Sequence, residues 1–245
     1  MTLENYLQVI EKFLSDYMAT AHSNGYVLGL SGGVDSTLVS LLTKKAVGKE
    51  KLTCIMMPIH SLPADLKDAL ELAKTCDLKY EIIDASEVFD QYIKSFEAIG
   101  VSLDTSTKAN LKARIRMSIL YAYAQKHNCL VLGTDNKDER YTGYFTKYGD
   151  GAADVYPIAK LVKGEVVEAA KLLGAPTRLA ERVPSAGLYE GQTDEKEMGI
   201  KYIDIDNYLL GKKIDDEVVN KIERLHRITE HKRIPVPEPE EFIRE

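Results

Sequence analysis

Apolar residues recur at helical spacing near the start of the chain and then gather into short runs. Four such runs alternate with stretches of helical periodicity. The opening helix is marked by Leu3, Leu7, Ile10 and Leu14; the apolar runs are Tyr26–Leu30, Leu52–Met57, Tyr80–Ile83 and Leu130–Leu132; the helical stretches cover about residues 36–47, 63–76, 86–99 and 107–128. Short buried strands that alternate with helices indicate a parallel sheet covered on both faces.

The pattern therefore predicts an α/β fold, a doubly wound parallel sheet flanked by helices, that extends to about residue 175. Residues 134–157 are rich in glycine, tyrosine, aspartate and lysine and lack clear periodicity, which indicates an ordered functional loop or a mobile lid. Residues 176–245 predict a loop followed by a helical tail. Because no linker or internal repeat is evident, we expect residues 1–245 to form a single domain.

The segment between the first apolar run and the first enclosed helix reads GLSGGVDS. Ligands of doubly wound sheets bind beyond the carboxyl ends of the strands, and this segment is expected there. Its glycines permit positive φ and close approach to phosphate oxygens, while N–H groups at the start of the next helix attract anions. These features predict a phosphate-binding loop made of Gly29, Leu30, Ser31, Gly32, Gly33, Val34, Asp35 and Ser36.

Asp35 lies in a loop that lacks the lysine of the common nucleotide-binding pattern G-x-x-x-x-G-K-[ST]. A carboxylate repels polyphosphate unless a cation lies between them, so Asp35 implies a bound metal ion. Mg²⁺ is expected, because it accepts carboxylate and phosphate oxygens together. The alternative interpretation is a strand-to-helix turn in which Asp35 only caps the helix.

The composition narrows the class of protein further. The 245 residues carry a net charge of −6 and are 44% hydrophobic, which suits a soluble globular protein and argues against nucleic acid as a partner. The acidic start is unlike a signal peptide, and no run approaches the roughly 20 apolar residues of a membrane span. The three cysteines lie far apart. We therefore expect a cytoplasmic protein with no membrane partner, disulfide framework or zinc site.

The string S-G-G-x-D-S after a strand resembles the pyrophosphate-binding loop of the N-type ATP pyrophosphatases. Three further stretches narrow the resemblance to ammonia-dependent NAD synthetases: NLKARIRM (110–117), LGTDNKDERYTGYFTKYGDGAADVYPIAKLVKGEV (132–166) and EHKR (230–233). The resemblance implies an adenine nucleotide alpha hydrolase-like fold and a homodimer with the dinucleotide site at the subunit interface. It also implies that ATP adenylates the nicotinate carboxylate of deamido-NAD and that ammonia then yields NAD, with release of pyrophosphate and AMP.

The same resemblance assigns roles to single residues. Asp35 and Glu139 would hold Mg²⁺, and Thr134 would contact ATP. Lys163 and Ser185 match further ATP-binding positions. Deamido-NAD would be bound by Arg114, Lys147, Asp154, His231 and Lys232. Without the resemblance, charged residues of these kinds are usually solvated helix-surface or loop residues.

Two positions carry less weight. Arg116 is expected to project to a different helix face from Arg114, and Gly187 stands where the resembled family commonly has an acid. The sequence analysis identifies no certain catalytic residue and no proton acceptor for ammonium.

Two other functions remain open at this stage. One is another adenylating ATP pyrophosphatase, such as a tRNA-thiolating or GMP-forming enzyme; thiolation should need reactive cysteines and a basic RNA surface, and this acidic chain shows neither. The other is an ATP-binding sensor without turnover, which would not need Asp35 and Glu139 as a metal-binding pair. The length leaves no room for a glutaminase-like domain, so ammonia is the expected nitrogen source.

Overall fold

The computed structural model describes residues 1–181 and 193–244, and within them four parallel strands form one sheet. The strands lie in the order β3–β2–β1–β4, which confirms the predicted α/β class. Their bounds are Gly25–Gly29 (β1), Leu52–Met56 (β2), Tyr80–Ile82 (β3) and Cys129–Val131 (β4). Because β1 pairs with both β2 and β4, the carboxyl ends of these three strands meet at one edge of the sheet.

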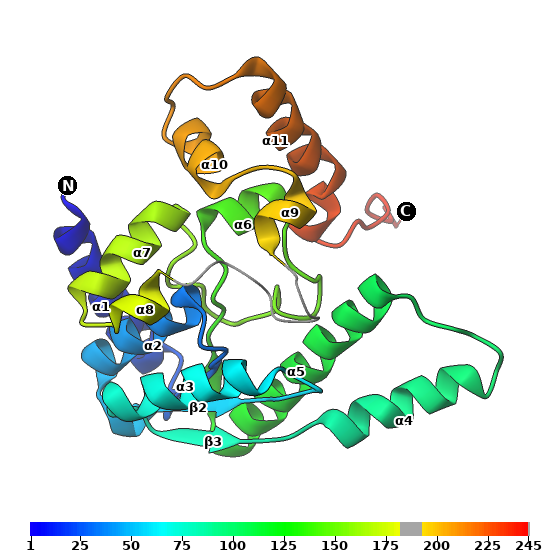
Figure 1. Ribbon diagram of the computed structural model, residues 1–245, viewed down its shortest axis with the longest axis horizontal. Coiled ribbons are helices and arrows are strands. Elements are labelled where there is room, and N and C mark those ends of the chain that lie inside the picture. Colours follow the sequence, from blue (N-terminus) through cyan, green and yellow to red (C-terminus); the bar gives the residue numbers. More distant parts are fainter. Residues whose placement is uncertain (182–192, 245) are drawn as a thin grey trace.

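Helices cover both faces of the sheet. The residues of β1 alternate between the faces: Tyr26 and Leu28 enter one apolar cluster, and Val27 enters a second cluster on the other side. The first cluster includes residues of α1 (Leu3–Thr20), α2 (Val34–Val47), α3 (Pro63–Thr75), α7 (Lys163–Leu172) and α8 (Thr177–Ala180). The second is covered by α5 (Thr105–His127), against which α4 (Ser86–Glu97) packs. Figure 1 shows α4 and the start of α5 extending to one side of the molecule.

Residues 194–232 are mostly helical and lie away from the sheet (Figure 1). The elements of this tail are α9 (Asp194–Met198), α10 (Tyr202–Leu209), α11 (Asp216–Ile228) and the 3₁₀ turn Glu230–Lys232. The tail packs against the short helix α6 (Lys137–Thr142). Ile205 and Ile222 are fully buried in a separate apolar cluster, against which Tyr141 of α6 packs. This cluster fastens the tail to the part of the chain that follows β4.

Two element boundaries differ from the sequence prediction for local reasons. α5 begins earlier than expected, because the Asp104 side chain accepts a hydrogen bond from the Thr107 N–H and caps the helix. The segment 134–157, predicted as an irregular loop, contains α6, which starts with a capping box between Asn136 and Glu139. No helix in the described part of the chain is long and apolar enough to cross a membrane.

Candidate active site at the carboxyl ends of the strands

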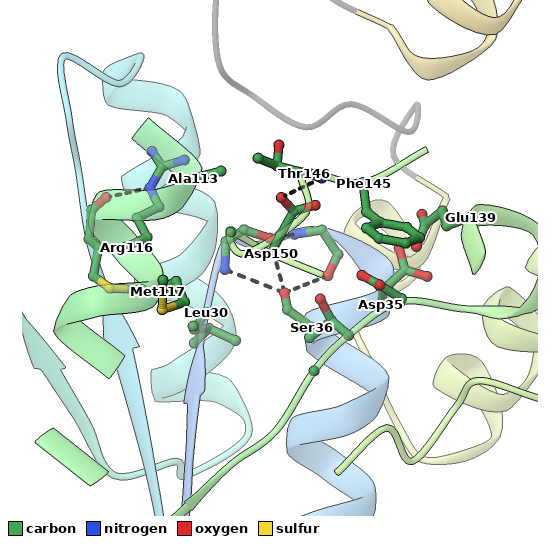
Figure 2. Close-up of a pocket in the computed structure, with 18 of the residues that line it drawn as sticks. Leu30, Asp35, Ser36, Ala113, Arg116, Met117, Glu139, Phe145, Thr146 and Asp150 are labelled. Atoms are coloured by element: carbon green, nitrogen blue, oxygen red, sulfur yellow. Dashed lines mark hydrogen bonds between the residues drawn. The ribbon is translucent and has the colours of Figure 1, made fainter. Parts of the chain in front are cut away.

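A cleft of about 590 Å³ opens where β1 and β2 end. The loop from β1 into α2, the start of α3, one side of α5, the segment after β4 and α9 all contribute to its walls. Figure 2 shows Asp35 and Ser36 on one side of the cleft and Arg116 and Met117 of α5 on the other. The phosphate-binding loop predicted from the sequence therefore forms one wall of this cleft.

The loop from β1 into α2 is held open by its own hydroxyl groups. Ser36 Oγ donates to the Gly33 carbonyl at 3.0 Å, and the Gly33 N–H donates to Ser31 Oγ at 3.2 Å. Gly32 has φ +80°, and a Cβ there would lie 3.0 Å from the Ala69 backbone nitrogen. The loop therefore needs a glycine at this position, and it presents the N-terminus of a 14-residue helix to the cleft.

Three charged side chains from distant parts of the chain meet beside this loop. Lys163 Nζ lies 2.6 Å from Asp35 Oδ2 and 3.2 Å from Glu139 Oε1. The other oxygen of Asp35 accepts a hydrogen bond from Asn136 Nδ2 at 2.8 Å. Lys163 is only 4% exposed, so its ammonium is neutralised almost entirely by protein carboxylates.

The electrostatics of this group follow from burial and proximity. Burial alone would lower the pKa of Lys163, but the carboxylates of Asp35 and Glu139 outweigh it and raise the pKa above its ordinary value. Burial and the Asp35 charge raise the pKa of Glu139 to about 7, although Lys163 opposes the shift. Near neutral pH the Glu139 carboxylate is therefore stabilised further by binding a proton or a second cation in addition to Lys163.

The donors present fit a hard divalent cation only in part. Asp35 and Glu139 offer carboxylate oxygens within reach of one point, as Mg²⁺ prefers. Among the described residues, however, no group of three or more His, Cys, Asp or Glu side chains is arranged to hold a metal ion. Mg²⁺ usually keeps several waters and binds through one or two carboxylates plus substrate phosphates, so these two residues suit an ion that arrives with a polyphosphate.

Tyr202, from α10, contacts two members of this group. Its hydroxyl donates to Asp194 Oδ2 at 3.0 Å and to Glu139 Oε1 at 3.3 Å, and its ring lies 4.7 Å from Lys163 Nζ. The side chain is buried. The sequence analysis missed Tyr202 and Asp194, because neither stands in a motif and both follow the core in the chain.

The backbone of Lys163 is fixed by two further carboxylates. Its N–H donates to Asp138 Oδ2 at 2.8 Å and to Asp206 Oδ1 at 3.1 Å, and the N–H of Gly164 donates to Asp206 Oδ2 at 2.8 Å. Acids at the first turn of α7 are favoured by the helix dipole. A Cβ on Gly164 would lie 2.7 Å from Asp206 Oδ2, so a larger residue here would displace the Asp206 carboxylate. The tail thus anchors the residue that pairs with Asp35.

A model of the family described as NAD synthase matches residues 6–236 of the chain. The chain belongs to this family. The NH₃-dependent NAD⁺ synthetase of Mesoplasma florum is 43% identical over the full length of both chains, and that of Methanocaldococcus jannaschii is 41% identical over 98% of each. These matches confirm the family and the ligase of NAD biosynthesis that the sequence predicted.

Solved structures agree with this assignment. The NMN synthetase of Francisella tularensis superposes with a TM-score of 0.92 at 38% identity, covering 98% of this chain and 99% of that one. The NH₃-dependent NAD synthetase of Campylobacter jejuni gives a TM-score of 0.81 at 33% identity, covering 98% and 100%. The parallel sheet and its flanking helices are therefore those of the NAD synthase family.

The residues predicted to bind ATP lie together where the structure describes them. Thr134 and Lys163 line the same cleft as the loop residues, with the exception of Gly32, whose contacts are with α3. Ser185 and Gly187 lie outside the described residues.

The residues predicted to bind deamido-NAD divide into three groups. Lys232 lines the cleft, where its Nζ donates to the carbonyls of Gly143 and Phe145. A second group, outside the cleft, consists of Arg114, Lys147 and His231, which are joined by hydrogen bonds. The Arg114 guanidinium donates to the Lys147 carbonyl, and Lys147 Nζ donates to the His231 carbonyl at 2.6 Å. Asp154 accepts hydrogen bonds from the Val131 N–H and the Tyr121 hydroxyl.

Arg116 received little weight from the sequence, yet it lines the cleft. Its Nε donates to the Met57 carbonyl at 3.0 Å, and its guanidinium reaches Ser61 Oγ at 3.3 Å. The sequence analysis also missed two further acids of the cleft, Asp135 and Asp150. Both stand within the stretch that carries the family resemblance, so their position in GTDN and YGDG was the available signal.

Proposed function

We propose that this protein adenylates the nicotinate carboxylate of deamido-NAD with ATP and then converts the acyl-adenylate to NAD with ammonia. The observation that carries the proposal is the meeting of an anion-binding helix N-terminus, two carboxylates and a buried lysine in one cleft. A non-catalytic ATP sensor does not require this combination. Family membership supports the same chemistry.

In the first step, a carboxylate oxygen of the substrate bonds to the α-phosphorus of ATP, and pyrophosphate leaves. The loop Ser31–Ser36 receives the departing phosphates through its N–H and hydroxyl donors. Lys163 supplies a positive charge. The pKa of its ammonium is raised so far that the group keeps its proton at pH 7. Mg²⁺ held by Asp35 and Glu139 would neutralise phosphate charge and polarise the bond that breaks. Positioning and charge stabilisation therefore account for this step.

In the second step, ammonia attacks the activated carbonyl carbon, and AMP leaves. A carboxylate is a poor acyl donor, and adenylation gives it a good leaving group. The cleft contains Asp135 and Asp150 in addition to the carboxylates near Lys163. Burial raises the pKa of Asp150 above its ordinary value, which brings it closer to the range useful for proton transfer.

The dinucleotide site extends, in this proposal, from Lys232 in the cleft to Arg114, Lys147 and His231 outside it. These three form a connected group at the surface. A second copy of the chain would close the outer part of the site. We therefore propose a homodimer with the dinucleotide at the subunit interface, active in the cytoplasm.

A second acceptor is nicotinate mononucleotide, which carries the same carboxylate without the adenylate half. The structural likeness to the NMN synthetase of Francisella tularensis favours considering it. The curated sequence relatives named above are NAD⁺ synthetases, which favours deamido-NAD. Deamido-NAD would contact outer residues such as Arg114. Nicotinate mononucleotide lacks the adenylate half and would leave these residues without a contact.

The test is an assay with ATP, Mg²⁺ and each acceptor in turn, with and without ammonium, scored for AMP, pyrophosphate and amidated product. The proposal predicts product from deamido-NAD with ammonium and almost none with glutamine at equal concentration. Faster turnover of nicotinate mononucleotide than of deamido-NAD would identify the mononucleotide as the preferred acceptor. Absence of pyrophosphate with both acceptors would refute adenylation.

A further inference from the structure

We propose that the Lys163 ammonium stands in for the divalent cation between Asp35 and Glu139 until ATP binds, so that the enzyme takes up metal only together with nucleotide. The inference rests on the proposed function for the identity of the nucleotide. It concerns a property of the nucleotide-free protein, however, and can be measured without turnover.

The geometry places one cation where two carboxylates converge. Lys163 Nζ lies 2.6 Å from Asp35 and 3.2 Å from Glu139, and the two carboxylate side chains are 16% and 14% exposed. A metal ion bound by the same oxygens would lie next to the ammonium. Like charges at such distances repel more strongly in a partly buried site than in water. Metal and ammonium therefore compete for these carboxylates.

The resting position of Lys163 is built into the fold. Its backbone N–H is bound by Asp138 and Asp206, and its ammonium lies over the ring of Tyr202. Glu139 is held by the Tyr202 hydroxyl at the same time. These contacts come from α6 and α10, which makes the ion pair part of a packed arrangement and not an exposed surface contact.

Charge balance explains why nucleotide would release the lysine. The triphosphate brings several negative charges to a cleft that Lys163 also lines. The ammonium then has phosphate oxygens as alternative partners, and Asp35 and Glu139 become available to the ion that accompanies ATP. Free metal offers no such exchange, because it leaves the ammonium without a counter-charge.

The experiment measures Mn²⁺ binding to the full-length protein at pH 8 without nucleotide, from the electron paramagnetic resonance signal of free Mn²⁺. Lys163→Met should bind Mn²⁺ at least about tenfold more tightly than the unaltered protein, because the competing charge is gone. Lys160→Met is the matched control. It removes the same charge from an exposed residue of the same segment that does not line the cleft, and should match the unaltered protein.

A second arm adds α,β-methylene-ATP, which binds without releasing pyrophosphate. The analogue should tighten Mn²⁺ binding strongly in the unaltered protein and less in Lys163→Met, because the variant has no lysine to displace. Adding Asp35→Asn to Lys163→Met should remove the gain in Mn²⁺ affinity, which locates the ion at this site. Circular dichroism verifies folding, and Lys163→Gln replaces Lys163→Met if the latter does not fold.

Equal or weaker Mn²⁺ binding by folded Lys163→Met or Lys163→Gln, in the absence of nucleotide, overturns the proposal. It would mean that the lysine does not compete with the metal. A gain that survives Asp35→Asn also overturns it, because the ion would then lie elsewhere. Neither result depends on the substrate assay, so failure of this inference and failure of the proposed function are distinguishable.

Discussion

The N-terminal end of helix α2 and its middle lie in opposite environments. Leu38, Val39 and Leu42 in the middle are fully buried in the apolar cluster of the sheet, whereas Asp35 and Ser36 at the N-terminus line the cleft. The apolar middle stabilises the fold by removing hydrocarbon from water. The polar end lies within a group of acids whose charges are compensated incompletely by the protein.

The imbalance at the polar end is visible atom by atom. Asp135 and Asp138 are almost fully buried, and one carboxyl oxygen of Asp135 has no hydrogen-bond partner among the described residues. Burial, followed by the neighbouring Asp206, raises the pKa of Asp138 to about 9. Such groups destabilise a folded protein unless something compensates them. The comparison teaches that the middle of α2 serves stability while its N-terminal end is arranged for a charged ligand.

The strongest test of this division is Asp35→Asn. Loss of the carboxylate nearest Lys163 removes a predicted metal ligand without changing the size of the side chain. Turnover should fall by at least roughly a thousandfold, since metal-ion charge stabilisation contributes several kcal/mol. The measurement is NAD formation, with circular dichroism as the control for folding. Activity near that of the unaltered protein would show that the polar end of α2 does not serve a metal ion.

Leu38→Ala probes the apolar middle of the same helix. Leu38 is fully buried, and the substitution should reduce the free energy of unfolding by about 2–5 kcal/mol. Urea unfolding measures this loss. The Michaelis constants of the protein that remains folded should be unchanged, because Leu38 does not line the cleft. A large rise in the KM for ATP alone would show that the two parts of the helix are not independent.

The variants Lys232→Ala and Lys163→Ala test which substrate each lysine binds. Removing a charged contact to one anionic ligand should weaken that ligand by about 1.5–3 kcal/mol, roughly tenfold to a hundredfold. Lys232→Ala is expected to raise the KM for deamido-NAD, and Lys163→Ala the KM for ATP. Each variant is titrated with one substrate while the other is near saturation. If Lys232→Ala weakens ATP alone, Lys232 does not belong to the dinucleotide site.

Asp135→Asn should make the protein more stable at neutral pH. Burial, followed by the nearby Asp150 charge, raises the pKa of Asp135 well above its ordinary value. The folded state therefore keeps this proton at pH values where the unfolded state has lost it, and stability falls as pH rises above about 4. The variant lacks this fall and should gain about 1–2 kcal/mol at pH 8 and less at pH 5. Urea unfolding at the two pH values measures the difference; an equal gain at both would exclude this proton as its cause.

The sequence was sufficient for the fold and for the parts of the site near motifs. Apolar runs and helical periodicity are local signals, and the strands and helices follow them to within a few residues. Lys163 and Glu139 stand inside the long stretch that resembles the family, so their roles were expected before their contact with Asp35 was seen.

The remaining site residues could not be identified from the sequence, because their roles depend on contacts between segments that are far apart in the chain. Tyr202 and Asp206 lie on an ordinary amphipathic helix of the tail, and nothing in their local pattern reveals that α10 packs against α7. Arg116 was given little weight because it was expected to project to a different helix face from Arg114. Its contact with the Met57 carbonyl, 59 residues away, decides its direction.

The two carboxylates at the start of α7 also change how that helix should exchange hydrogen with solvent. The first N–H groups of a helix have no partner within it and normally exchange quickly. Those of Lys163 and Gly164 are bound by Asp138 and Asp206, one from α6 and one from α10. The Gly164 N–H donates to Asp206 of α10, so its exchange rate in deuterated water should report how often α10 separates from the core. The Lys163 N–H should exchange more slowly, because Asp138 of α6 still accepts from it when α10 moves away.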